Sequence, residues 1–475
     1  MYFPYPSWLV AGDNSWQMTA ATFVGLMSLP GIAVLYGGLV KKKWVVNTML
    51  MAFAGFAAVL VAWVFWAYQM GFGNSIHLAG NGANILNGFL AHPGSVAGPG
   101  PLLNQANIPN LASASPPFHF SGASLIYFQF VFAGITPLLF LGSVLGRMNF
   151  KAWLIFVPAW TTCVYAVNAA LIWGGGYWAQ KGALDYSGGY VIHLAAGVTG
   201  FVAAWIIGPR LLRDRQSFPP TNLLLVAVGA GIIWLGWNGF NGGDPYYANA
   251  DAAAAILNTN LCTATALLTW VVCDTFLSPA KKPTFLGAIN GMIVGLVCIT
   301  PAAGFVNGNA AALMGVLASA IVFFAWNYLP KIRPFSKVDD ALGVVYTHGI
   351  AGFLGGIMTG FAADPHMVEY VAGKTNAASL WTGLNGAAGL IYGNSDRVLI
   401  QFLTALTIIV WDGVVTALLL LIIKYVLRVP LRYSDAELEE GDVAVHDEEV
   451  EPPVYVTRSD LLQRQMPAAE MEGAR

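Results

Sequence analysis

The sequence predicts an all-α integral membrane protein with eleven transmembrane helices. Hydrophobic residues make up 57% of the chain, charged residues only 10%, and the mean hydropathy is +0.62. A soluble domain carries about 25% charged residues, so lipid must cover most of this surface. Of the 24 acidic residues, 12 lie in residues 433–475. We therefore expect residues 1–432 to form a transmembrane domain and residues 433–475 to form an acidic, polar tail.

Eleven apolar segments are candidates for the transmembrane helices. A helix that crosses a bilayer needs roughly 20 predominantly apolar residues. Several of the segments are short or are interrupted by Gly and Pro. Their approximate bounds are 16–39, 46–71, 124–145, 152–173, 189–208, 222–242, 256–278, 285–302, 308–329, 342–363 and 399–427.

The content of charges and motifs excludes several classes of function. The net charge of −2 gives no field that would attract an anionic polymer, so nucleic acid is not an expected partner. The sequence contains no phosphate-binding loop and no metal-ligand spacing. Its four cysteines lack C-x-x-C spacing and are expected to be buried free thiols. We expect neither an enzyme nor a bound cofactor or metal.

The distribution of Lys and Arg predicts the orientation in the membrane. Cytoplasmic loops carry an excess of these residues. With the N-terminus outside, the inside loops and the flank of the last helix hold 16 Lys and Arg residues, and the outside loops hold 3. An odd number of helices then places the C-terminal tail in the cytoplasm.

Two short motifs that each occur twice indicate an internal repeat. Residues 193–200 (HLAAGVTG) and 348–355 (HGIAGFLG) both fit H-x-x-A-G-x-x-G, and Ile-Thr-Pro occurs at 135–137 and at 299–301. The motifs pair the fifth candidate helix with the tenth and the third with the eighth. Five helices per half would insert the halves with opposite orientation, the five-plus-five plan of many transporters, whose site lies at the midplane.

Two histidines are the leading candidates for function, because ionisable groups inside a membrane are costly. His193 and His348 hold equivalent positions in the repeat. Two neutral imidazoles can hydrogen-bond to each other and still present one free ring nitrogen each. Such a pair suits a path for a small neutral polar molecule or for a proton. A purely structural pair and a haem-ligand pair are the alternatives, and small Ala and Gly neighbours argue against room for a haem.

Other candidates lie toward the helix ends. Trp173, Phe132 and Phe240 are candidates for a cation–π cup, although interfacial aromatic belts are common. Asp244 follows Phe240 and could add a carboxylate to the cup or only cap a loop. Asp185 is expected to anchor the N-terminus of the helix that carries His193. Asp412 has no evident partner, and a hydrogen bond to a neighbouring helix or subunit is its simplest role.

At these residues the sequence resembles the ammonium transporter family (Amt/Mep/Rh). The resemblance covers essentially the whole hydrophobic body, and DYSGGYVIHLAAG is similar to the family's signature segment. YGGLVKKK, FQFVFAGITP, IWGGG, GWNGFNGG, ITPAAG and KVDDALGVVYTHGIAG match as well, while GSVLGRMNFKAW and FNGGDPY lean toward the plant AMT2-like and related microbial branch.

The resemblance implies a homotrimer in the cell membrane, either plasma or inner, in which each protomer has its own pore. It assigns His193 and His348 as pore histidines, Phe132 and Phe240 as a stacked outer gate, and Trp173 as the wall of the external ammonium site. It further assigns Asp185 as the buried Asp near that site and Tyr36 as a residue toward the inner mouth. Many members have Ser where this chain has Asp244, a departure that implies stronger or differently tuned ion recruitment unless the Asp244 side chain turns away.

The expected function is ammonium transport. In this hypothesis the outer aromatic vestibule recruits NH4+, the ion loses a proton, and NH3 passes a hydrophobic pore lined by the two histidines, with or without separate proton transport. Methylammonium would serve as an analogue. The tail resembles a cytoplasmic regulatory tail whose partner in many prokaryotes is a PII-type protein. A channel for another neutral solute, an ammonium sensor and a membrane redox enzyme are the rival interpretations.

Overall fold

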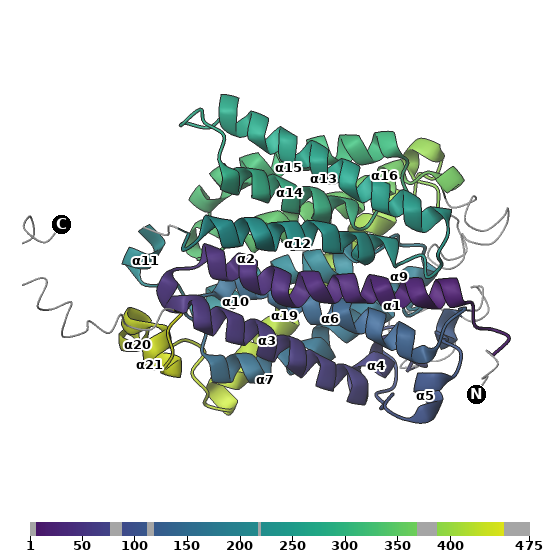
Figure 1. Ribbon diagram of the computed structural model, residues 1–475, viewed down its shortest axis with the longest axis horizontal. Coiled ribbons are helices and arrows are strands. Elements are labelled where there is room, and N and C mark those ends of the chain that lie inside the picture. Colours follow the sequence, from purple (N-terminus) through teal and green to yellow (C-terminus); the bar gives the residue numbers. More distant parts are fainter. Residues whose placement is uncertain (1–5, 77–87, 112–117, 217–219, 368–386, 451–475) are drawn as a thin grey trace, which may run out of the picture.

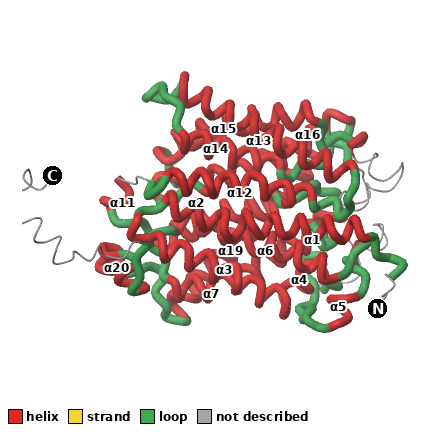
Figure 2. Tube along the Cα trace, viewed as in Figure 1, coloured by secondary structure: helices red, strands yellow, loops and turns green. Residues whose placement is uncertain are grey.

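The computed structural model describes residues 6–76, 88–111, 118–216, 220–367 and 387–450. Within these ranges the protein is helical, with three isolated β-bridges and no β-strand. The long helices lie side by side, and the loops gather at the two ends of the bundle (Figure 1, Figure 2). The N-terminus lies at one end, and the short helices α11 (Leu212–Gln216), α20 (Asp435–Glu440) and α21 (Asp442–His446) lie at the other.

Each of the eleven predicted segments coincides with a helix or with a run of consecutive helices. Nine runs in the described residues are long and apolar enough to cross a membrane, and α14 is a shorter apolar helix. The elements of the eleven segments are α1 (Ala11–Leu26), η1 (Met27–Gly31), α2 (Ile32–Leu39), α3 (Val45–Ala62), η3 (Trp63–Ala67), α4 (Tyr68–Phe72), α6 (Gly122–Val144), α7 (Phe150–Trp160), η6 (Thr161–Tyr165), α8 (Ala166–Ile172), η7 (Gly189–Leu194), α10 (Ala195–Ile207), α12 (Leu223–Gly242), α13 (Ala250–Phe276), α14 (Phe285–Ile299), α15 (Gly308–Tyr328), η10 (Val345–Ile350), α16 (Ala351–Ala362), α19 (Arg397–Leu421) and η13 (Ile422–Val426).

The helices differ in how far the bundle encloses them. Helix α6 lies inside the bundle, and nearly all of its residues are buried. The run that begins with α19 lies at the periphery, and most of its residues are exposed or only partly buried. Large aliphatic side chains such as Leu224, Leu235 and Leu257 point outward from α12 and α13. A continuous apolar outer surface on helices of this length fits contact with lipid. Cys262, Cys273 and Cys298 are buried free thiols, as expected, whereas Cys163 is a free thiol that is only partly buried.

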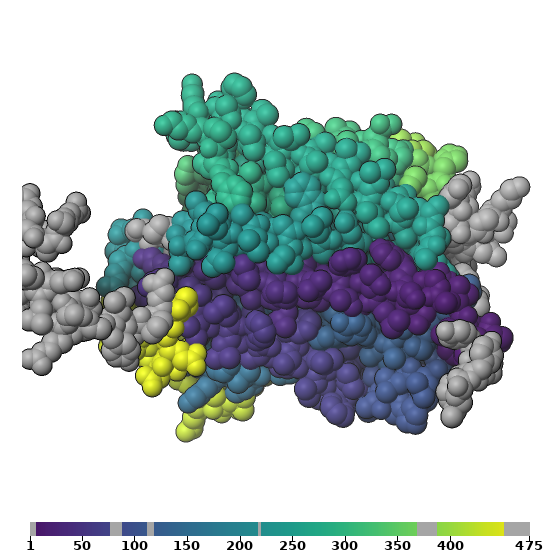
Figure 3. All heavy atoms as spheres, viewed as in Figure 1, coloured from purple at the N-terminus to yellow at the C-terminus, as the bar shows by residue number. Residues whose placement is uncertain are grey.

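The first part of the tail folds back onto the bundle (Figure 3). Tyr433 stacks on Trp44, and the Asp442 carboxylate accepts hydrogen bonds from the backbone N–H groups of Val46 and Asn47 at the start of α3. His446 Nε2 lies 2.9 Å from Asn47 Oδ1. A carboxylate at a helix N-terminus satisfies free amide groups and interacts favourably with the helix dipole. Residues 433–450 are therefore docked, and residues 451–475 lie outside the described part of the chain.

Candidate functional site

His193 and His348 meet inside the bundle. Their Nδ1 atoms lie 3.3 Å apart, the ring centroids 5.4 Å apart, and the ring planes differ by 25°. At this distance one Nδ1 donates and the other accepts, which requires at least one neutral imidazole. His193 Nε2 is buried and, among the described residues, has no hydrogen-bond partner. The pair predicted from the repeat therefore exists, and it leaves a ring nitrogen free for a small polar molecule.

Both histidines lie in π-helical turns that begin at a carboxylate-anchored N-terminus. His193 belongs to η7, and His348 belongs to η10. Asp185 accepts hydrogen bonds from the N–H groups of residues 188–191, so its predicted role as an anchor is confirmed. Asp340 does the same for Val344 and Val345. π turns are frequent at functional sites, but η1, η3, η6 and η13 are π turns as well, so it is the matched anchoring of η7 and η10 that sets these two apart.

Asp340 shows that the repeat is longer than the sequence analysis recognised. Asp185 and Asp340 each lie eight residues before their histidine, and Gly188 and Gly343 each lie five residues before it. Both glycines have positive φ, +111° and +75°, a conformation that favours glycine. The shared pattern is D-x2-G-x4-H-x2-A-G-x2-G over residues 185–200 and 340–355. The equal spacing was the signal that could have identified Asp340.

Glycines of the repeat bring the two histidine-bearing segments together. A Cβ atom at Gly197 would lie 2.2 Å from the Cα of Gly349, and a Cβ at Gly352 would lie 2.6 Å from the carbonyl oxygen of Gly189. The contacts are reciprocal, since each segment places a glycine of its H-x-x-A-G-x-x-G pattern against the residues around the other histidine. Such a backbone approach is possible only without a side chain, as is typical of membrane helix interfaces.

A column of aromatic rings continues from His193. The ring of His193 stacks on Trp237 at 5.3 Å and lies 5.9 Å from Phe240. Phe240 lies 4.3 Å from Phe132, which contacts Trp173 edge to face at 6.1 Å. All of these rings except Trp237 were predicted from the sequence. Trp237 lies one helical turn before Phe240 and is fixed by a hydrogen bond that it donates to Thr300. The residues predicted as outer gate and outer wall thus form one continuous row of ring contacts with His193.

Trp173 and Asp185 are connected directly. Trp173 Nε1 donates to the backbone carbonyl of Asp185 at 2.8 Å, so the aromatic wall and the helix anchor hold each other in place.

Asp244 is 1% exposed and lies near Asp185 and Ser187. Its Oδ2 has no hydrogen-bond partner among the described residues. A buried carboxylate oxygen without a partner is costly, and a bound cation or water would satisfy it.

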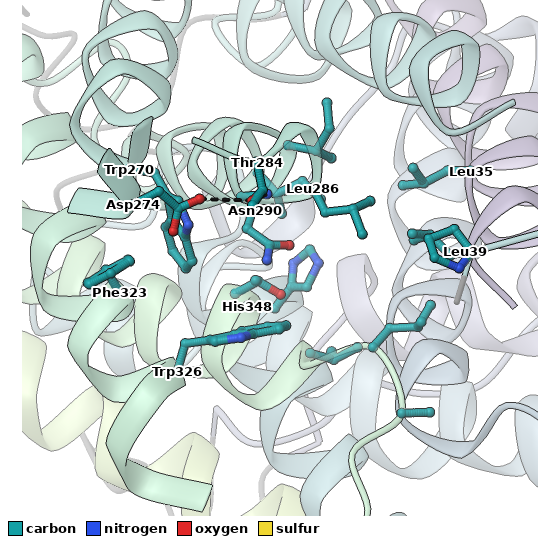
Figure 4. A pocket seen from close by; sticks show the side chains of 18 of the residues that line it. Leu35, Leu39, Trp270, Asp274, Thr284, Leu286, Asn290, Phe323, Trp326 and His348 are labelled. Atoms are coloured by element: carbon teal, nitrogen blue, oxygen red, sulfur yellow. Dashed lines mark hydrogen bonds between the residues drawn. The ribbon is translucent and has the colours of Figure 1, made fainter. Parts of the chain in front are cut away.

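A cavity of about 350 Å³ lies beside His348 (Figure 4). Its lining includes Leu39, the last residue of α2, at the end of the bundle that carries the tail (Figure 1). His348 and the predicted inner-mouth residue Tyr36 both line it. The Tyr36 hydroxyl donates to the carbonyl of Leu139 at 3.2 Å, which fixes the ring on the cavity wall. His348 therefore lies between the aromatic column, which it meets through His193, and an open cavity whose walls are largely apolar.

Asp412 has the simple structural role that the sequence analysis favoured. Asn168 Nδ2 of α8 lies 3.0 Å from each Asp412 carboxylate oxygen, which ties α19 to its neighbour. Within the described residues, no group of three or more His, Cys, Asp or Glu side chains could hold a metal ion.

Comparison with known proteins agrees with this geometry. The family model of the Ammonium Transporter Family matches residues 15–451 and so extends into the docked part of the tail. Ammonium transporter 3 member 2 of Oryza sativa subsp. japonica is 48% identical, with 93% of this chain and 90% of that protein covered. Ammonium transporter 2 of Arabidopsis thaliana is 47% identical, with 94% and 89% covered. The resemblance to the plant AMT2-like branch is thereby confirmed.

Solved structures show the same fold. The crystal structure of Saccharomyces cerevisiae Mep2 superimposes with a TM-score of 0.76 at 28% identity, covering 90% of this chain and 89% of that one. A structure described as a sensor Amt protein has a TM-score of 0.75 at 22% identity, covering 90% of this chain and 96% of that one, and supports the fold alone. The chain is thus a multi-pass membrane protein that resembles transporters and not enzymes.

Proposed function

Because the chain belongs to the Ammonium Transporter Family, we propose that it transports ammonium across a cell membrane and that the conducted species is NH3. The observation that carries the proposal is the pair of histidines, hydrogen-bonded between an aromatic column and an open cavity. The outer rings, with Trp173 as a wall and Asp244 as a carboxylate, recruit NH4+. The ion gives a proton to water in the outer vestibule, NH3 passes Phe132 and Phe240 and the two imidazoles, and it takes a proton from water in the cavity.

Loss of a proton costs less than loss of hydration. Moving an intact NH4+ ion into an apolar pore requires an isolated charge to leave water, which costs far more than any single contact returns. The pKa of ammonium lies about two units above neutral, so removal of its proton costs about 3 kcal/mol at pH 7. A pore whose polar lining is a neutral imidazole pair and whose gate is aromatic suits NH3 and rejects the ion. Whether the proton crosses separately is measured as current across a liposome membrane.

The wider architecture is part of the same proposal. Eleven crossings with the N-terminus outside place the histidines near the midplane between two five-helix halves of opposite orientation. The protomer works as one of three copies, with lipid around the trimer and residues 1–432 as its transmembrane domain. The tail, residues 433–475, is cytoplasmic and regulatory, and a PII-type protein is its candidate partner. A cell membrane, either plasma or inner, is the expected location.

The test is uptake of labelled methylammonium by cells that lack their own ammonium carriers. We expect the wild-type protein to restore uptake and the His193→Ala, His348→Ala double variant to abolish it at equal surface expression. His92→Ala, which removes an exposed histidine, is the matched control and should transport normally. Wild-type uptake by the double variant would mean that the pair only connects two helices. A Trp173→Leu variant with unchanged uptake would favour a channel for neutral solutes that needs no cation site.

A further inference from the structure

One part of the cavity beside His348 has no role in the transport proposal. We call this part the recess; it is lined by Trp270, Asp274, Asn290, Phe323 and Trp326. Trp270 of α13 and Phe323 and Trp326 of α15 form its aromatic wall, and Asn290 of α14 faces it together with His348 (Figure 4). Trp270 meets Phe323 at 5.5 Å and Trp326 at 6.3 Å, both edge to face. These contacts fix the rings, so the recess is preformed.

Asp274 supplies the recess with a carboxylate. It lies one helical turn after Trp270, lines the cavity, and is 8% exposed. Its Oδ2 accepts a hydrogen bond from the Thr284 hydroxyl at 2.8 Å, and among the described residues its Oδ1 accepts none. A fixed carboxylate beside indole rings provides the two attractions, charge and cation–π, that hold a small cation.

Asp274 also has a structural role at the start of α14. Thr284 is the N-cap of α14, because its side chain accepts from the N–H of Gly287, and Asp274 holds Thr284 in place. That role uses one carboxylate oxygen. It does not account for the second oxygen, nor for the wall of three aromatic rings and an amide around a cavity of about 350 Å³. The two roles also respond differently to substitution, since a cap needs an acceptor and a cation site needs a charge.

The position of Trp326 also supports a cation site in the recess. In the two-half arrangement proposed above, the fourth helix of the first half is the α7–α8 run and the fourth helix of the second half is α15. Trp173 follows the last residue of α8 and belongs to the outer aromatic stack. Trp326 lies in the last turn of α15 and belongs to the inner recess. Each half therefore ends its fourth helix with an indole at one mouth of the proposed pore.

We propose that Trp270, Asp274, Asn290 and Trp326 form a cation-binding site at the inner mouth, which takes ammonium and small alkylammonium ions on the cytoplasmic side. The inference rests on the proposed transport function. A cation held there lies in the same cavity as His348 and obstructs the exit of the next NH3 molecule. The site makes internal ammonium an inhibitor of its own influx.

The experiment uses right-side-out vesicles that contain the full-length protein and are preloaded with unlabelled methylammonium. Initial influx of labelled methylammonium is measured against the internal concentration. We expect influx to fall as internal methylammonium rises. The half-inhibitory concentration should increase about fivefold in Asp274→Asn, the effect of losing one partly solvated charge contact, and in Trp326→Leu. The external KM should not change in either variant.

Two further variants distinguish a cation site from a helix cap. Thr284→Val removes the N-cap and keeps the Asp274 charge, so its half-inhibitory concentration should equal that of the wild type. Glu440→Gln removes an exposed carboxylate at the same end of the molecule and is the matched control. Wild-type inhibition in Asp274→Asn, or equal effects of Asp274→Asn and Thr284→Val, would overturn the inner site alone. A wild-type protein without any influx would overturn the transport function and the inner site with it.

Discussion

Gly197→Ala tests how closely the two histidine-bearing segments must approach. Its Cβ would lie 2.2 Å from the Cα and 2.5 Å from the N of Gly349, the residue that follows His348. An ordinary carbon–carbon contact needs about 3.5 Å, so η10 would have to move away from α10 by roughly 1 Å. The Nδ1 atoms of the histidines, now 3.3 Å apart, would then lie beyond hydrogen-bonding distance.

The size of the effect follows from this displacement. Overpacking of a well-packed interface costs about 1–3 kcal/mol of stability. A misplacement of 1 Å at a functional group costs on the order of 10²-fold in rate. We therefore expect Gly197→Ala to lower methylammonium uptake between about tenfold and a hundredfold, with a lower unfolding temperature in detergent.

Two other glycines make the experiment a graded series. A Cβ at Gly349 would lie 3.2 Å from the Cα of Gly197, a tight contact that needs a shift of only a few tenths of an ångström, so Gly349→Ala should have a smaller effect. A Cβ at Gly231 in α12 would meet no atom within 4 Å, and Gly231→Ala should behave as the wild type. Normal uptake per folded molecule by Gly197→Ala would refute the argument that the spacing of the histidines limits conduction.

Half-buried Asp340 and buried Asp412 should separate anchoring from conduction. Asp340→Ala frees the N–H groups of Val344 and Val345, so a loss of about 1 kcal/mol and a partial loss of uptake are expected; unchanged thermal unfolding would contradict the anchor role. Asp412→Asn keeps an acceptor for Asn168 and should unfold and transport normally, whereas Asp412→Leu should lower stability by about 1–3 kcal/mol in the same assay. Lost uptake in a stably folded Asp412→Asn protein would show that the charge itself is needed.

The helical segments and the histidine pair could be predicted because lipid imposes a simple rule on sequence. Apolar runs of sufficient length must be helical in a bilayer, so hydropathy alone located every segment. The histidines could be paired because H-x-x-A-G-x-x-G occurs twice and the Gly residues of that pattern form the contact. The anchor role of Asp185 followed from its place before an apolar helix.

The partners across helices could not be predicted in the same way. Which residue faces Asp412 or stacks on His193 depends on the rotation and tilt of neighbouring helices, and these are set by packing between residues far apart in the sequence. Asn168 lies 244 residues from Asp412, and no local pattern relates them. The recess around Asp274 combines three helices for the same reason. Asp340 is a different case, because its spacing from His348 equals that of Asp185 from His193 and was visible in the sequence.

The docked tail leads to a last prediction, in which buried Asp442 and half-buried His446 respond to pH in opposite directions. Burial raises the pKa of Asp442 from 3.8 to about 6, against the hydrogen bonds from Asn47 and Val46. The docked tail therefore binds this proton more readily than the undocked tail, and docking gains stability as the pH falls through 6. Burial lowers the pKa of His446 below 6.5, opposed by the charge of Glu448. The docked tail thus disfavours the charged imidazole, and docking loses stability as the pH falls through 6.5.

Substituting either Asp442 or His446 should reveal how the other residue makes docking depend on pH. In Asp442→Asn only His446 titrates, so docking should weaken when the pH falls from 7.5 to 5.5. In His446→Gln only Asp442 titrates, and docking should strengthen over the same interval by about fourfold, which follows from a pKa of 3.8 undocked and about 6 docked. Hydrogen exchange of the peptide that contains Val46 and Asn47, corrected for the intrinsic pH dependence of exchange, reports docking directly, because Asp442 accepts from both amides. Shifts of the same sign in the two variants would mean that groups other than this pair control the tail.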